Sequence, residues 1–261
     1  ETKIISFIGT HKSEKKFITS SLNKNIKYNF LLKNNSPTIN KLRYLDDYKK
    51  TKIIGIYDLN DDLISKKEEN TFYSTLKKNM KRYDLIIVAD YGHGIITEKI
   101  RKLILKNSHK VFLNTQINSF NRGYHTALKY KKVNTLVINE GELRYELRDK
   151  NSKIIDLVKN LSKKISTKNI VVTSGMRGAT TVNCTNGSAT SCPAFNQNNI
   201  DTVGAGDTFF AVYALSTGAK IGTKTSMLMA SISASFAINQ LGRKYFFTDK
   251  ILKKHLTHIF K

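Results

Sequence analysis

The sequence has few cysteines and no long apolar run. Its 261 residues include only two cysteines, Cys184 and Cys192, without metal-ligand spacing. This excludes a disulfide framework and indicates a reducing compartment, with both side chains packed as small apolar residues. No apolar run approaches the ~20 residues that a membrane-spanning helix needs, and the first residues carry no basic segment followed by a long apolar core. We therefore expect a soluble, cytoplasmic protein without a membrane partner.

Acidic residues are also scarce. There are 20 Asp and Glu against 44 Lys and Arg, which gives a formal net charge of +24. Such an excess often indicates nucleic acid or an anionic surface as the partner. The lysines are spread along the whole sequence, however, so most are expected on solvated faces, where their field helps to gather phosphorylated substrates. Nucleic-acid binding is the minority interpretation, and it predicts a steeply salt-dependent association with DNA or RNA.

The most informative stretch is Asn199–Phe210. It contains a turn of small residues, Gly204–Gly206, then Asp207, then a run of helix formers. A turn that opens a helix leaves N–H groups without partners, and the helix dipole favours negative charge there. Asp207 would repel an anion unless it had another task, such as accepting the proton of a hydroxyl that attacks a phosphoryl group. The spacing alone leaves open that Asp207 is only a helix cap.

Residues 201–209 (DTVGAGDTF) closely resemble the C-terminal signature of the ribokinase (PfkB) family of sugar kinases. The resemblance implies that Asp207 is the catalytic base. The amides of the anion hole would be those of Gly204, Ala205 and Gly206. The leading hypothesis is therefore an ATP-dependent kinase that phosphorylates a hydroxyl group of a sugar or sugar phosphate.

Strands and helices alternate along the chain, which predicts an α/β fold with a mostly parallel sheet covered by helices. Together with the resemblance, this indicates a ribokinase-like three-layer sandwich. The predicted strands are 3–9, 83–90, 110–114, 135–139 and 169–173, with a hairpin at 179–193, and the predicted helices are 13–22, 68–81, 97–105, 153–165, 208–216, 223–240 and 248–260.

Two further runs, Pro37–Tyr44 and Lys52–Asp58, predict a two-stranded ribbon. In the resembled family such strands form a small β lid over the sugar, so 37–58 is predicted as a lid insertion. Lys41 and Arg43 alternate on one face and can present two cations to a substrate phosphate. Alternatively, each cation only protects an exposed edge strand.

The segment Asp90–Gly94 (DYGHG) is similar to the DYGKG segment of bacterial heptose-phosphate kinases. Asp90 ends a predicted strand, where ligands bind in open α/β sheets, and the resemblance implies that it binds sugar hydroxyls. The resemblance also implies that the acceptor is similar to heptose 7-phosphate. It further implies a fused or associated nucleotidyltransferase, which that subgroup often has. The later loop Asn118–His125 is expected to be a surface loop, with ligand contacts by Asn121 and Arg122 as the alternative.

Asn139 and Glu142 have the Asn-x-x-Glu spacing that resembles the family's magnesium and phosphate motif. A carboxylate and an amide at a strand-to-helix junction can orient the waters that Mg²⁺ retains, so we expect both residues to reach the metal through water. The alternative is a strand-ending Asn and a first-turn Glu that complements the helix dipole.

A second glycine pattern, Thr173, Gly175 and Gly178, resembles the family segment that lies against the nucleotide phosphates and ribose. By itself it is also a common tight turn. The resemblance places adenine between the helix 223–240, where Ser231 replaces a frequent Asn, and the loops near Asn183 and Phe195.

The resemblance covers residues 1–261 as one domain, but the family's N-terminal strands, which grip the sugar, have no counterpart in this sequence. We expect that an N-terminal part is missing. A regulatory protein of the same fold, which binds nucleotide or sugar but has impaired catalysis, is therefore the alternative to an active kinase. We also expect a homodimer.

Overall fold

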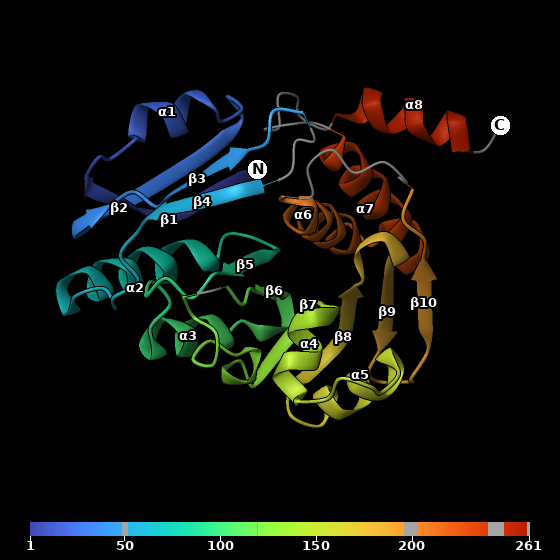
Figure 1. Cartoon of the computed structure of the whole chain (residues 1–261). Coiled ribbons are helices and arrows are strands. Elements are labelled where there is room, and N and C mark those ends of the chain that lie inside the picture. The colour runs from blue at the N-terminus through green and yellow to red at the C-terminus, as the bar shows by residue number, and fades with distance from the viewer. Residues whose placement is uncertain (49–51, 119, 196–202, 240–247, 260–261) are drawn as a thin grey trace. The chain divides into compact units, whose positions relative to one another are not determined.

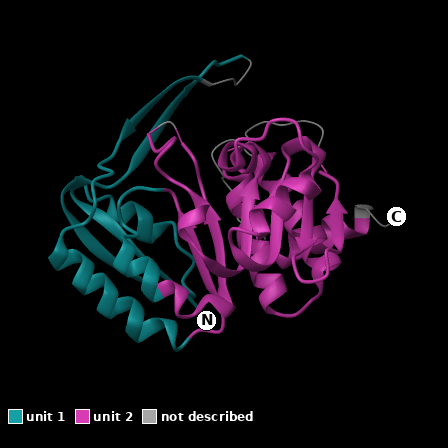
Figure 2. Cartoon of the chain, turned by 90° about the horizontal axis from the view of Figure 1, so that it is seen from below, with its two compact units in different colours: residues 1–82, 92–103 teal, residues 83–91, 104–261 magenta. Residues whose placement is uncertain are grey.

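The structure, a computed structural model, describes residues 1–48, 52–118, 120–195, 203–239 and 248–259 (Figure 1). The chain divides into two compact units (Figure 2). The first contains residues 1–82 and 92–103, and the second contains residues 83–91 and 104–261. The expectation of a single domain stays a prediction.

In the first unit, β1 (Thr2–His11) pairs in parallel with β2 (Ile26–Pro37), and α1 (Lys15–Ser20) lies between them in sequence. The predicted strand 3–9 therefore belongs to a two-stranded sheet, and not to the larger sheet described below. β2 was not among the predicted strands. Its signal was the alternation of Tyr28, Phe30 and Leu32, which is typical of a strand.

The predicted ribbon is confirmed: β3 (Asn40–Leu45) and β4 (Lys52–Asp58) pair antiparallel in the same unit. Residues that face each other across such a pair share one side of the ribbon. Leu42 opposite Ile56 and Tyr44 opposite Ile54 therefore form an apolar face. Side chains alternate along a strand, so the residues between these pairs, including the two predicted phosphate ligands of β3, lie on the opposite face.

The first unit also contains α2 (Lys66–Met80). Its N-cap is Ser65, whose side-chain oxygen accepts a hydrogen bond from the backbone amide of Glu68, while the Glu68 carboxylate accepts one from the backbone amide of Ser65. This capping box satisfies two amides that the helix leaves without partners. Phe72 is buried and meets the ring of Phe7 on β1 at 5.1 Å, so α2 packs against this part of the unit.

The second unit is built on a six-stranded sheet in the order β10-β9-β8-β7-β6-β5. Neighbouring strands from β5 to β8 are parallel, and β9 and β10 are antiparallel additions. The predicted mostly parallel sheet is thus confirmed. The strands are β5 (Ile86–Asp90), β6 (Val111–Thr115), β7 (Lys132–Asn139), β8 (Ser166–Thr173), β9 (Ala179–Asn183) and β10 (Ala189–Cys192).

Helices cover both faces of this sheet and complete three layers (Figure 1). On one face, Val137 and Val171 pack with Phe209, Tyr213 and Met227 in a continuous core. The other face is covered by two short helices that contact β7 and β8. None of the described helices has the length and apolarity needed to span a membrane. The helices are α3 (Glu98–Leu105), which crosses from the first unit to the second, α4 (Glu140–Leu147), α5 (Ile154–Ser162), α6 (Ala205–Gly218), α7 (Thr223–Ile238) and α8 (Asp249–Ile259).

Candidate active site

A pocket of about 370 Å³ opens in the second unit beside the last residues of β7 and β8 and the first residues of α6. Apart from these strand and helix ends, most of the pocket wall is apolar and includes Met176, Phe195 and Phe209. Pockets of this size with apolar walls and a few polar groups are typical of small-molecule sites. Seven of the residues predicted to bind nucleotide or anion line it together: Asn139, Thr173, Gly175, Gly178, Ala205, Gly206 and Ser231.

The turn after β8 forms one side of the pocket. Gly175 and Gly178 have φ of 58° and 85°, which L-residues with side chains rarely adopt. A Cβ on Gly178 would lie 2.1 Å from the carbonyl oxygen of Cys192. Glycine is required here because the turn passes directly against the end of β10, which leads to Ala194 and Phe195 in the pocket wall.

The same turn is tied to the start of α4 by Glu140, which was not among the predicted site residues. One Glu140 carboxylate oxygen accepts hydrogen bonds from Arg144 at 2.9 and 3.0 Å, and the other accepts from Arg177 at 2.5 Å. Burial alone would raise the pKa of Glu140, but the hydrogen bonds from Arg144 and Arg177 help to lower it overall. Glu140 is therefore charged near neutral pH and holds the turn 175–178 beside Asn139.

The start of α6 forms another side. Gly204 has φ 76° and begins the helix, and no side chain of the described residues caps it there. The amides of Gly204, Ala205 and Gly206 thus belong to an uncapped helix start, where the dipole favours an anion. Asp201 and Thr202 of the motif, and the helix end predicted at 241–242, lie outside the described residues.

Asp207, the predicted base, is half-buried in the first turn of α6. The Tyr91 hydroxyl donates a hydrogen bond to its Oδ1 at 2.6 Å. Tyr91 was not among the predicted site residues. The available signal was its position immediately after β5, since residues that follow parallel strands meet at one edge of the sheet.

Glu142 lies close enough to Asp207 for their charges to interact. Its two oxygens accept backbone hydrogen bonds from Asn139 at 3.1 Å and from Ile117 at 3.0 Å. Burial raises the pKa of Glu142, the two backbone hydrogen bonds oppose the rise, and the charge of Asp207 adds to it. A cation between the two carboxylates would relieve this repulsion.

These residues suit Mg²⁺ bound mainly through water. Among the described residues, no group of three or more His, Cys, Asp or Glu is arranged to hold a metal. Magnesium retains several waters and needs only one or two carboxylates alongside substrate phosphates. Glu142 and Asp207 supply two carboxylates, and Asn139 adjoins Glu142, since its backbone amide donates to that carboxylate and its side chain caps α4 through Gly141.

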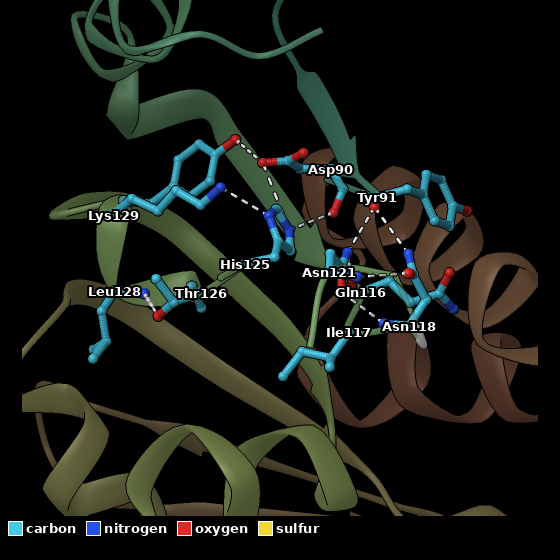
Figure 3. A network of polar contacts seen from close by, with 12 residues as sticks. Asp90, Tyr91, Gln116, Ile117, Asn118, Asn121, His125, Thr126, Leu128 and Lys129 are labelled. Atoms are coloured by element: carbon cyan, nitrogen blue, oxygen red, sulfur yellow. Dashed lines mark hydrogen bonds and ion pairs between the residues drawn. The ribbon is translucent and has the colours of Figure 1, made fainter. Parts of the chain in front are cut away.

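Asp90, the predicted ligand of sugar hydroxyls, is only 6% exposed. Its Oδ2 accepts a hydrogen bond from the hydroxyl of buried Tyr130 at 2.7 Å, and His125 lies beside it (Figure 3). The carboxylate therefore takes part in an internal network, and its contact with a sugar stays a prediction. Lys41 and Arg43 lie on β3 in the first unit, where the Lys41 ammonium is 3.4 Å from Nε2 of His93.

Comparison with known proteins gives a consistent result. Residues 1–249 match the family described as pfkB family carbohydrate kinase. The chain is 26% identical over 227 residues to the bifunctional protein HldE of Aliarcobacter butzleri, which covers 85% of this chain and 46% of that protein. It is 25% identical to the bifunctional protein HldE of Bradyrhizobium diazoefficiens, over 86% of this chain and 45% of that protein. The chain thus spans about half the length of these relatives.

Solved structures confirm the ribokinase-like fold. The ribokinase from Giardia lamblia superposes with a TM-score of 0.76 at 16% identity, over 98% of this chain and 82% of that one. The phosphofructokinase-2 from Escherichia coli gives 0.74 at 13% identity, over 99% of this chain and 82% of that one. At such identities the likeness shows the fold alone.

Proposed function

We propose that this chain, which belongs to the pfkB family of carbohydrate kinases, phosphorylates a hydroxyl group of a sugar phosphate similar to heptose 7-phosphate. The observation that carries the proposal is that one pocket is lined by Asn139, Thr173, Gly175, Gly178, Ser231 and, directly before Asp207 in α6, Ala205 and Gly206. The choice of a heptose follows from the DYGHG segment at 90–94.

In the proposed reaction, Asp207 accepts the proton of the acceptor hydroxyl while its oxygen bonds to the γ-phosphorus of ATP and ADP leaves. The amides at the start of α6 stabilise the charge on the transferred oxygens. Mg²⁺ would supply charge neutralisation at the phosphates, with Glu142 and Asn139 orienting its waters. Glycines 175 and 178 let the backbone approach the nucleotide, and α7 with Phe195 encloses the base.

The direct test is transfer of phosphate from ATP to heptose 7-phosphate, with fructose 6-phosphate and ribose as competing acceptors. Asp207→Asn should lower kcat by ~10²–10⁴-fold, the usual contribution of general-base catalysis. Asp156→Asn, which changes an exposed carboxylate on α5, is the matched control and should leave kcat unchanged. Nucleotide binding without transfer to any acceptor would instead support the regulatory protein of the same fold.

We also propose that Lys41 and Arg43 bind the phosphate already present on the acceptor. They share one face of the ribbon, and two adjacent cations suit a phosphate. Arg43→Ala should raise KM for the sugar phosphate and leave KM for ATP unchanged. An equal rise in both KM values would contradict this role. Asp90 remains our proposed ligand for the sugar hydroxyls.

The opposite face of the ribbon supports the expected homodimer. Leu42, Tyr44, Ile54 and Ile56 are 48–54% exposed and form an apolar surface on one side of β3 and β4. We propose that a second copy of the chain covers it, because contiguous exposed apolar patches mark interaction sites. Leu42→Lys with Ile56→Lys should convert a dimer into a monomer in sedimentation equilibrium. An unchanged mass would exclude this surface as the interface. A fused or associated nucleotidyltransferase, proposed from the resemblance, would be tested by co-purification.

A further inference from the structure

The side chain of Tyr91 forms a hydrogen bond with Asp207, the proposed base. Its hydroxyl donates to Asp207 Oδ1 at 2.6 Å, although the two residues are 116 positions apart in the sequence. Hydrogen bonds to a charged acceptor are shorter and stronger than neutral ones. A donor on one carboxylate oxygen restricts rotation of the whole group, so Tyr91 fixes the direction in which Asp207 presents its oxygens.

Tyr91 is itself held by the described residues, 116–118 and 120–125, of the loop 116–125 (Figure 3). Its carbonyl oxygen accepts hydrogen bonds from the side-chain amides of Asn118 at 3.2 Å and Asn121 at 2.9 Å. The Asn121 amide also donates to the carbonyl oxygen of Gln116 at 3.0 Å. Two asparagines of one loop thus converge on the backbone of the residue that contacts the proposed base.

Asp90, which precedes Tyr91, is also held through its carbonyl oxygen by a side chain of this loop. Nε2 of His125 lies 3.0 Å from the carbonyl oxygen of Asp90, and Lys129 lies 2.8 Å from Nδ1. Because Lys129 can only donate, Nδ1 is the acceptor and Nε2 carries the proton given to Asp90. Burial, followed by the charge of Lys129, lowers the pKa of His125, while Asp90 and Glu146 partly oppose the shift. A neutral, buried His125 therefore fixes Asp90 at the end of β5.

The loop also reaches the second acid of the site. The backbone amide of Ile117 donates to Glu142 at 3.0 Å, next to the asparagines that hold Tyr91. Contacts from this one loop thus reach Glu142 directly and Asp207 through Tyr91. A surface loop without such a task would not be expected to direct three side-chain donors at two successive carbonyl oxygens.

We propose that Tyr91 is a positioning residue for the phosphoryl transfer, which orients the carboxylate of Asp207, and that the loop 116–125 fixes Tyr91 for this purpose. The proposal rests on the proposed function, in which Asp207 accepts the proton of the acceptor hydroxyl. Proton transfer depends on orientation, so a base whose carboxylate is held by a second side chain is already arranged for reaction.

The test begins with Tyr91→Phe, which keeps the ring and removes the hydroxyl. Loss of a hydrogen bond to a charged group predicts a kcat lower by ~10-fold or more, with KM for ATP within about twofold of the original chain. Tyr124→Phe is the matched control: it removes a hydroxyl from the same loop, but Tyr124 is 88% exposed, so kcat should not change. Asn121→Ala should lower kcat in the same direction without changing Asp207 or Tyr91.

A double-mutant cycle distinguishes positioning from a structural role. If Tyr91 acts through Asp207, adding Tyr91→Phe to Asp207→Asn should not lower the residual kcat further. A full additional loss in that background, or a Tyr91→Phe variant with unchanged kcat, would overturn the proposal while leaving the kinase function intact. Absence of phosphate transfer by the original chain to any sugar phosphate would overturn both.

Discussion

Substitution of Gly178 by alanine tests how the turn after β8 shapes the pocket. Gly178 has φ 85° and ψ −140°, a conformation that costs a residue with a side chain ~1–3 kcal/mol. The new Cβ would lie 2.1 Å from the Cys192 carbonyl oxygen, and since real Cβ contacts are not shorter than 3.0 Å, the backbones must separate by at least 0.9 Å. Overpacking of this kind costs a further ~1–3 kcal/mol.

The total predicted loss for Gly178→Ala is therefore ~2–6 kcal/mol in the free energy of unfolding. At roughly 2–4 °C per kcal/mol for a chain of this size, the midpoint of thermal unfolding should fall by about 10 °C. Because the displaced end of β10 leads to Ala194 and Phe195, KM for ATP should also rise. Urea denaturation and a nucleotide titration measure the two effects.

Gly187 provides the matched control. It lies in the turn between β9 and β10 and has φ 72°, but a Cβ built on it meets no atom within 4 Å. Gly187→Ala should therefore lose only the ~1–2 kcal/mol of left-handed strain and should leave KM for ATP unchanged. Equal losses for the two substitutions would refute the argument that close approach to β10 requires glycine at position 178.

Other predictions follow from charged groups of the second unit. Because the pKa of Glu142 is raised, its carboxylate takes up a proton at a pH above its ordinary pKa of 4.5. The increase in melting temperature produced by ATP and Mg²⁺ should therefore become smaller on acidification from pH 7.5, and this loss should be steeper in the original chain than in Glu142→Gln. The pKa of His125 is lowered in the folded chain, so on acidification the unfolded chain binds the proton at a higher pH than the folded chain does. The free energy of unfolding should therefore fall as the pH drops below 6.5, and urea denaturation should show a smaller fall in His125→Gln. Arg177→Ala releases the turn from Glu140 and should raise KM for ATP severalfold without changing the KM for the acceptor, measured by initial rates.

Local sequence determined the positions of most strands and of several residues of the candidate site. Apolar runs placed the parallel strands β5 to β8, because parallel strands in a sheet covered by helices are rich in apolar residues. Short patterns also put Asn139, Thr173 and Gly204 at the ends of β7 and β8 and at the start of α6. The ends of parallel strands meet at one sheet edge, so these positions could be predicted to lie together.

Only the tertiary structure decided the contacts between distant segments. The sequence did not predict that β1 pairs with β2, that Asp90 is buried and accepts a hydrogen bond from Tyr130, or that the Tyr91 hydroxyl reaches Asp207. Local patterns report which face of a strand or helix is apolar. They carry no information on which side chain occupies the space opposite, because that depends on how separate elements pack and which hydrogen bonds remain to be satisfied.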